Sequence, residues 1–379
     1  MNLMTASNQW MSRPADQRFE TLDALSTAVN DRRKLSTAVD INVSNLHVES
    51  QTIMIPQNDA PDIQSERLIF NSEIAPAVPT HWAFSQMCRE TKLASDTLRR
   101  LPTNIVADAL NYRLQKVEKP ELKLMAIQDP EGEVNTLQAI TSRTYGRIWD
   151  ADVVKATQTL IQTGDEKHGK KFFNPKDWSG KPSGLYASDH DVFVFMIDGG
   201  SVVDVGWDQK GQRDLLHRGF IISNSEVGAA SFSIMMFMFR VVCGNHIIWD
   251  ASDIQKLMIR HTQNGPTRFV SEAMPHLEAY CNQLAKPQED AIKRVRQYLL
   301  PSKSDDVVIL GKKLGFTRGE TLAAITAANK EEGQCATGWD LINGYTAHAR
   351  SFEHIDTRLD LETRAGKLIT SLGATAVSI

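Results

Sequence analysis

Arg143, Tyr145 and Arg147 alternate along the chain, a pattern that could bind a nucleic acid. Side chains at alternate positions of an extended segment share one face. Two guanidinium groups on that face could each contact a phosphate, while the ring between them stacks on a base. Alternatively, the two arginines pair with carboxylates and Tyr145 completes the core. The spacing alone leaves both interpretations open.

Asp189, His190 and Asp191, with Asp204 further along, are residue types that bind a divalent metal. On a strand, however, His190 would point away from the two neighbouring carboxylates, so the three could not converge. We therefore favour a polar turn before the buried strand that begins at Val192. A metal-dependent enzyme that acts on nucleic acid through Asp189, Asp191 and Asp204 is the alternative.

Two polar segments between strand-like stretches predict tight turns. The first is Asn224-Ser225-Glu226 with Gly228, whose side chains can bond backbone groups. The second contains Gly244 and Asn245. We expect structural roles for these residues: Asn224, Ser225, Glu226, Gly228 and Asn245.

The segment from Lys286 to Arg318 is basic, with eight Lys or Arg residues against four Asp or Glu residues. A helix that presents Lys312 and Lys313 could line a phosphate-binding groove. An ordinary solvated helix face would show the same charges.

The elements that must position these residues divide the chain into three parts. Apolar runs predict strands, several of them covered on both faces, at Leu122–Ile127, Val134–Ser142, Leu185–Ile197, Leu215–Ser223 and Ser231–Val242. Helical spacing predicts two short helices from His81, joined at Leu101-Pro102, and one at Ala151–Gln162. Gly199-Gly200 predicts a hairpin turn.

After Trp249 the pattern is helical, with capping boxes predicted at Ser252/Gln255 and Thr317/Glu320. We therefore expect an α+β fold, a curved and mostly antiparallel sheet with flanking helices and a helical C-terminal third. The predicted boundaries are an arm at 1–80, an α+β core at 81–250 and a helical region at 251–379.

The arm is acidic, with ten Asp or Glu and six Lys or Arg residues, which accounts for the whole net charge of -4. Four prolines between residues 53 and 79 predict a poorly structured segment with a short helix near Thr21–Val29 and one or two edge strands.

Composition excludes several classes of protein. The 379 residues, 41% of them hydrophobic, predict a globular chain, and four dispersed cysteines fit reduced thiols. The longest apolar runs are six residues, so we expect a soluble, intracellular protein. No phosphate loop, H-E-x-x-H motif or nucleophile elbow occurs, so neither a nucleotide cofactor nor a catalytic residue is predicted.

Taken together, the blocks of sequence resemble a phage- and plasmid-associated family, domain of unknown function 932. The resemblance covers roughly His81 to Leu372, and the blocks that carry it are Leu101-Pro102 with Leu110-Asn111, Ile140 to Tyr145 with Asp150, Arg218-Gly219-Phe220 with Asn224 to Gly228, Arg240-Val241-Val242-Cys243-x-Asn245, and Trp339 to Arg350 with Asn343 and Thr346. The chain departs from the family pattern at His246, where glycine is usual, and at Gln138, where arginine is frequent.

The resemblance implies a mobile genetic element expressed in a bacterial cytoplasm. Proteins of that setting often handle single strands in recombination or replication, which is an inference from context. Our leading hypothesis is a single-stranded DNA-binding, annealing-type protein that forms homo-oligomers. The residues expected at its interface are Arg143, Tyr145, Arg147, Arg218, Arg240, Lys312 and Lys313.

Two alternatives to this hypothesis stay open. One is the metal-dependent enzyme, and the other is a host-factor-binding protein that acts through the acidic arm. The pI of about 6.2 counts against a binder that depends on counterion release.

Overall fold

The computed structural model describes the chain from Pro14 to Thr375 with internal gaps. The described residues are 14–57, 60–72, 76–118, 121–130, 134–168, 172–175, 182–207, 211, 213–240, 246–248, 257–282, 286–352 and 355–375.

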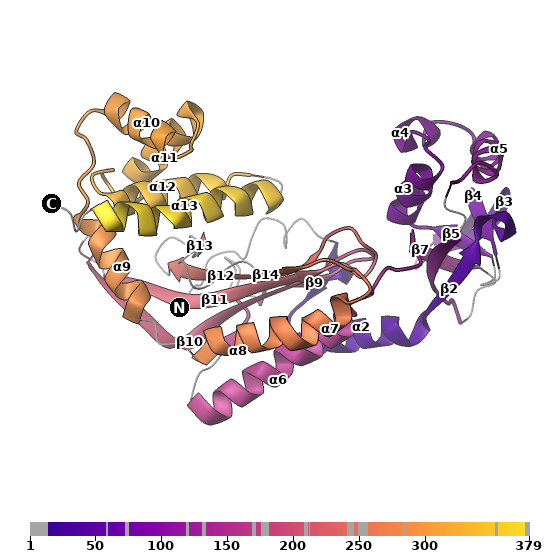
Figure 1. Ribbon diagram of the computed structural model, residues 1–379, viewed down its shortest axis with the longest axis horizontal. Coiled ribbons are helices and arrows are strands. Elements are labelled where there is room, and N and C mark those ends of the chain that lie inside the picture. Colours follow the sequence, from indigo (N-terminus) through magenta and orange to yellow (C-terminus); the bar gives the residue numbers. More distant parts are fainter. Residues whose placement is uncertain are drawn as a thin grey trace.

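Two sheets organise the molecule, and Figure 1 shows them in two lobes. The smaller sheet has the order β2-β6-β7-β5-β4-β3, and the larger follows β1-β9-β10-β11-β12-β13, with β8 paired to β10 and β14 to β12. The strands of the smaller sheet are β2 (Ser36–Asn42), β3 (His47–Gln57), β4 (Ala60–Asn71), β5 (Ala77–Pro79), β6 (Glu121–Ile127) and β7 (Asn135–Ser142). Those of the larger sheet are β1 (Arg18–Phe19), β8 (Phe172–Phe173), β9 (Leu185–Ala187), β10 (Val192–Trp207), β11 (Arg213–Asn224), β12 (Phe232–Arg240), β13 (His246–Ile248) and β14 (Leu257–Ile259).

Helices flank both sheets (Figure 1). Those beside the smaller sheet are α3 (His81–Glu90), α4 (Ser95–Leu98) and α5 (Thr103–Leu114). Those beside the larger sheet are α2 (Leu22–Leu35), α6 (Asp150–His168), α7 (Gly265–Arg268), α8 (Met274–Asn282), α9 (Lys286–Gln297), α10 (Ser304–Lys313), α11 (Arg318–Glu331), α12 (Gly338–Ala349) and α13 (Ile355–Thr375). A π-helical turn, Phe269–Ala273, joins α7 to α8.

The long strands of the larger sheet are apolar on both faces because both faces are covered. Val194 and Met196 of β10 pack in one core cluster with Leu25 of α2 and Leu277 of α8. Phe195, which points to the opposite face, belongs to a second cluster. A continuous apolar run therefore produces a central strand, as the sequence predicts.

The predicted fold class is confirmed. The sheets are mostly antiparallel, with β5 and β7 as a parallel pair, and the long strands of the larger sheet curve across the molecule (Figure 1). The C-terminal part is helical from α7 onward. Among the described residues, no helix is both long enough and apolar enough to cross a membrane.

Three local predictions are wrong. Gly199 and Gly200 do not form a hairpin, because β10 continues through them with a shift in its register against β11. The predicted strand Leu185–Ile197 is broken into β9 and β10 by residues 188–191. Leu257 and Met258 are not helical but lie in β14, which pairs with β12.

The N-terminal arm is more structured than the sequence predicts. The helix expected near Thr21 is present and longer, as α2, and residues 36–79 supply four strands of the smaller sheet. The predicted boundary at residue 80 therefore falls inside one sheet, between β5 and β6. The second predicted boundary, at residue 250, and the capping box at Ser252 lie outside the described residues.

Candidate nucleic-acid interface

Arg143, Tyr145 and Arg147 do not share one face, because β7 ends at Ser142 and the chain then turns. The guanidinium of Arg143 is exposed and forms ion pairs with Glu121, at 2.9 Å between Nη1 and Oε2, and with Asp40, at 3.4 Å. Side chains at alternate positions share a face only within a strand, so the predicted common face is absent from Arg143 onward.

Tyr145 and Arg147 point into the protein. The Tyr145 hydroxyl donates to the backbone oxygen of Ser225 at 3.2 Å, and its ring stacks on His261 with 5.2 Å between ring centroids. Burial raises the pKa of the Tyr145 phenol. Arg147 pairs with Glu226, Nε to Oε2 at 2.9 Å, and their side chains are only 8% and 7% exposed. The alternative interpretation, pairing of both arginines with carboxylates, is the one the geometry shows.

The turn after β11 is the centre of a buried polar network. The Asn224 amide donates to Asp150 Oδ1 at 2.7 Å, and Glu226 Oε1 accepts from the Asp150 backbone N–H at 2.6 Å. The Ser225 hydroxyl donates to the backbone oxygen of His190 at 2.5 Å. Burial, and then the nearby Glu226 carboxylate, raise the pKa of Asp150. These contacts are the ones expected of a structural turn.

The same turn joins the two lobes. The Val227 backbone oxygen accepts from the Trp82 indole N–H at 3.0 Å and from the Gln86 amide at 2.8 Å, both on α3. Gly228 has a φ of +81°, which favours glycine, and the Tyr145 ring lies 3.3 Å from where a Cβ would stand. Asn245, predicted in a second turn, lies outside the described residues.

The other predicted cations divide between interior and surface. Arg218 of β11 is 1% exposed, so its side chain does not face a phosphate chain in solution. Arg240 ends β12 opposite Leu216, and its side chain is not described. Lys312 and Lys313 are exposed at the end of α10. Of the predicted set, these two lysines and Arg143 face solvent among the described side chains.

The carboxylates of the alternative metal site are separate. Asp189 pairs with His190 at 2.6 Å, which lowers the pKa of Asp189, and the Asp191 carboxylate accepts from the Ser188 hydroxyl. Asp204 is far along β10 and pairs with Arg213 at 2.5 Å. Within the described parts of the chain, no three His, Cys, Asp or Glu side chains are placed to hold a metal ion. Asp189 and His190 form a bend between β9 and β10, as the turn interpretation predicts.

One exposed aromatic residue, which lies beside two arginines, was not predicted from the sequence. Trp207, at the end of β10, is 59% exposed, and the Arg213 guanidinium lies 4.7 Å from its ring centroid. Arg296 of α9 donates to the Trp207 backbone oxygen and pairs with Asp214 at 2.7 Å. A tryptophan beside a polar, glycine-containing stretch between two strand-like segments was the available sequence signal.

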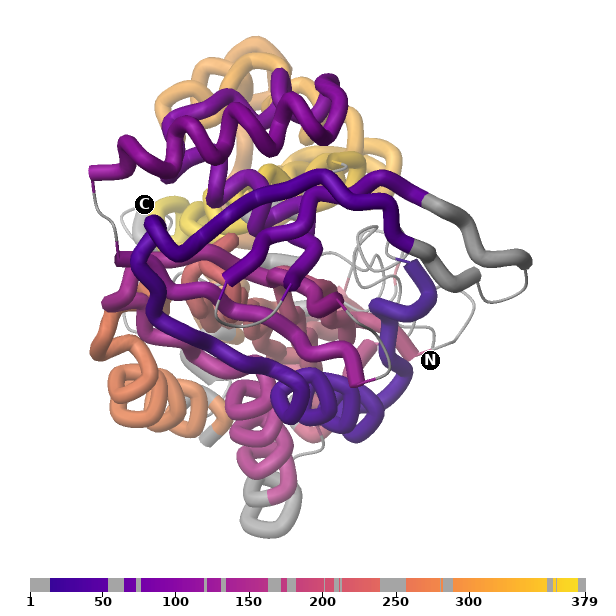
Figure 2. Tube along the Cα trace, turned by 90° about the vertical axis from the view of Figure 1, so that its right-hand side faces the viewer, coloured from indigo at the N-terminus to yellow at the C-terminus, as the bar shows by residue number. Residues whose placement is uncertain are grey.

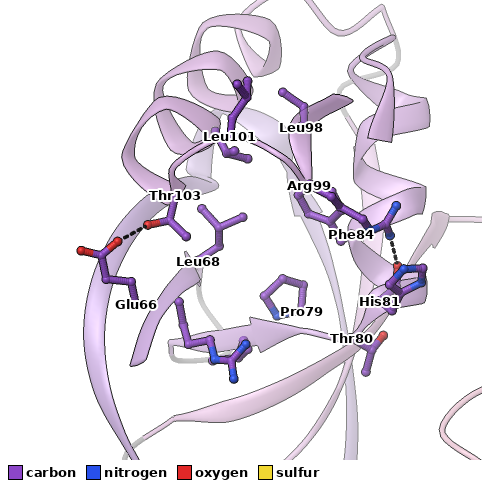
Figure 3. Close-up of a pocket in the computed structure, with 13 residues that line it drawn as sticks. Glu66, Leu68, Pro79, Thr80, His81, Phe84, Leu98, Arg99, Leu101 and Thr103 are labelled. Carbon is purple, nitrogen blue, oxygen red and sulfur yellow. Dashed lines mark hydrogen bonds between the residues drawn. The ribbon is translucent and has the colours of Figure 1, made fainter. Parts of the chain in front are cut away.

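A pocket of about 330 Å³ lies in the smaller lobe (Figure 3). Its interior is apolar, with Leu68, Pro79 and Phe84 in the wall. The Arg99 guanidinium lies 5.0 Å from the Phe84 ring centroid and donates to the His81 backbone oxygen at 2.8 Å. The charged group at the pocket therefore already has partners within the protein.

Comparison with known proteins gives one match. The family model described as domain of unknown function (DUF932) matches residues 140–361, which include the turn network, most of the larger sheet and helices α6 to α12. No curated protein and no solved structure gives a significant match to the chain.

Proposed function

The chain belongs to the DUF932 family, and we propose that it binds single-stranded nucleic acid, as an annealing-type protein that uses no nucleotide cofactor. The proposed setting is recombination or replication of a phage or plasmid in a bacterial cytoplasm. We propose DNA as the partner and a homo-oligomer as the working form, because repeated weak contacts along one strand add to useful affinity.

The exposed indole of Trp207 is the observation that supports this proposal. A large aromatic ring that is 59% exposed is unusual for a tryptophan, which is highly buried on average. Bases stack on exposed aromatic rings and on guanidinium planes, and such stacking accepts any base. The ring of Trp207 and the guanidinium of Arg213 together offer both kinds of surface.

The protein holds this aromatic residue in place through its backbone. Asp214, which is fully buried, accepts from Arg296 at 2.7 Å and from the Trp339 indole N–H at 3.1 Å, and Arg296 in turn binds the Trp207 backbone. The backbone at Trp207 is therefore anchored to the helical region while its side chain faces solvent.

The charge around Trp207 is nearly balanced, which predicts how the binding depends on salt. Arg213 pairs with Asp204 at 2.5 Å, and Lys293 pairs with Glu289. We therefore expect stacking to supply most of the affinity and counterion release to supply little. The salt dependence should accordingly be shallow, which agrees with a formal net charge of -4.

The test compares Trp207→Ala with Tyr112→Ala. Tyr112 of α5 is also 59% exposed, and Lys116 lies 3.9 Å from its ring centroid, so it is a matched control in the other lobe. With a fluorescent oligo(dT) of about 30 nucleotides, Trp207→Ala should lose about 1–3 kcal/mol of binding free energy. Tyr112→Ala should bind as the unchanged protein does.

Two results would remove the proposal. One is no binding of the oligonucleotide by the unchanged protein at about 50 mM salt, where phosphate contacts are strongest. The other is an equal loss of affinity in both variants.

A further inference from the structure

Helices α10 and α11 form a helix–turn–helix arrangement. Helix α10 ends at Lys313, and α11 begins at Arg318 after a connection of four residues, Leu314–Thr317. A connection of three to four residues that contains glycine is characteristic of this motif. Figure 1 shows the pair at one end of the molecule, on the outer side of α12 and α13.

The connection is a defined turn. Gly315 has a φ of +90°, and the Phe316 backbone N–H donates to the Gly311 oxygen at 3.0 Å, which closes the end of α10. Thr317 then caps α11: its hydroxyl accepts from the Glu320 backbone N–H at 3.1 Å, and the Glu320 carboxylate accepts from the Thr317 N–H at 2.7 Å.

The two helices meet closely at a glycine. A Cβ on Gly311 would stand 2.3 Å from Thr321 Oγ1, so only glycine allows this approach. Thr321 and Tyr345 of α12 share a hydrogen bond of 2.8 Å. Ala324 packs equally closely on α12, since a Cβ on Gly344 would stand 2.2 Å from the Ala324 backbone oxygen. The inner face of α11 is thereby fixed against the helical core.

The outer face of α11 carries side chains suited to DNA. Four exposed residues recur every fourth position: Arg318, Leu322, Thr326 and Lys330. Arginine, threonine and aliphatic side chains are among those that contact base edges and the thymine methyl group in the major groove. Exposed Lys312 and Lys313 stand just before the turn, where cations can contact phosphates.

Nearby carboxylates point away from this outer face. The Glu320 carboxylate pairs with Arg364 of α13 at 2.6 Å, and Glu331 pairs with Arg350. Asp305 and Asp306 lie in the first turn of α10, at the opposite end of that helix from Lys312. The turn and the outer face of α11 are therefore locally basic in a chain whose net charge is negative.

We propose that this module binds duplex DNA, with α11 in the major groove and Lys312 and Lys313 on the adjacent phosphates. Arg318 and Thr326 contact base edges, and Leu322 packs against a thymine methyl group. The proposal goes beyond single-strand binding at Trp207 and does not depend on it, because the two sites use different residues and different forms of DNA.

The test uses a labelled pool of duplexes of about 20 base pairs with randomised centres, measured beside the single-stranded oligo(dT). Lys312→Ala/Lys313→Ala should weaken duplex binding on the order of tenfold or more and lower the slope of log affinity against log salt by about two, since each phosphate contact contributes roughly 0.9. Arg318→Ala/Thr326→Ala should abolish the enrichment of a shared sequence from the pool. Single-strand binding should change little in either variant.

The matched control is Arg67→Ala/Arg100→Ala, which removes two exposed cations from the smaller lobe. It should leave duplex binding unchanged, and the melting temperatures of all variants should match that of the unchanged protein. The proposal is overturned if that protein binds no duplex at about 50 mM salt. It is also overturned if the control loses as much affinity as the lysine variant, or if the lysine variant loses single-strand and duplex binding equally. Loss of single-strand binding in Trp207→Ala with duplex binding intact supports two separate sites.

Discussion

Arg147 and Arg143 differ in what surrounds them, although both belong to one sequence pattern. Arg147 is buried against Glu226, and its guanidinium carbon lies 3.7 Å from the Trp149 ring centroid. Arg143 is exposed, and its contacts with Asp40 and Glu121 are surface ion pairs. An exposed pair contributes little to stability, whereas breaking a buried pair leaves a charge without compensation.

Arg147→Ala should therefore lower the free energy of unfolding by about 3–5 kcal/mol, because Glu226 would stay buried without its partner. Arg143→Ala should leave it close to that of the unchanged protein, as is usual for a surface substitution. Urea denaturation of the two variants and the unchanged protein measures both effects. Equal stability of the two variants would show that the Arg147–Glu226 pair does not hold the turn in place.

Sequence spacing could not predict the contacts of Arg147 and Tyr145, because their partners lie far away along the chain. Arg147 and Glu226 are 79 positions apart, and Tyr145 meets Ser225 across 80 positions. The sequence does predict the polar turn Asn224–Glu226, since its residue types bond backbone groups locally. It also predicts the bend at Asp189, for the same reason. The periodicity of a strand does not apply to Arg143, Tyr145 and Arg147, because these residues follow the end of β7.

At the scale of single elements, local chemistry predicts well. The capping box of Thr317 and Glu320 follows from residue type and spacing, and it is present. The long strands β10, β11 and β12 follow from their apolar runs. The three-residue strand β14 does not, because it is too short to show a period and is a strand only through its pairing with β12.

Glu320 also makes the stability of the fold depend on pH in a way that can be measured. The hydrogen bond from Arg364, followed by those from Thr317, lowers the pKa of Glu320 from 4.5 to about 2. A carboxylate with a lowered pKa in the folded state stabilises the fold above its unfolded pKa, and this contribution is lost as the pH falls from about 4.5 toward 2.

Glu320→Gln keeps a capping side chain but cannot pair with Arg364 as a charge. The melting temperature of the variant should therefore lie below that of the unchanged protein at pH 7, and the gap should close as the pH falls below about 4.5. Arg364→Gln should show the same closing gap. A gap that stays constant from pH 7 to about 3 would mean that the ion pair contributes nothing to stability.

At the scale of the whole molecule, the composition of the first 80 residues does not predict their place in the fold. An acidic, proline-containing segment predicts an independent arm, yet β1, β2 and β5 of this segment pair with strands that lie far along the chain. β2 pairs with β6 from Ser36 opposite Ile127 to Asn42 opposite Glu121. Figure 2 shows α2 beside α6, where Arg33 and Asp152 form an ion pair of 2.5 Å. Pairing across such distances leaves no local signature in the sequence.

The first 80 residues are therefore expected to be essential for folding, in contrast to what their composition suggests. Leu25 of α2 is fully buried in the core cluster of the larger sheet, so Leu25→Ala should cost about 2–5 kcal/mol. Thr27, exposed on the same helix, is the matched control, and Thr27→Ala should leave the stability within about 0.5 kcal/mol.

A chain that starts at Pro79 would lack β2, β3 and β4 and would expose the apolar residues that face them, among them Leu124 of β6. We expect that truncated chain to be insoluble or to lose its cooperative thermal transition, as followed by circular dichroism. A soluble, cooperatively melting truncated chain, together with an unchanged melting temperature for Leu25→Ala, would show that α2 and the first strands are dispensable after all.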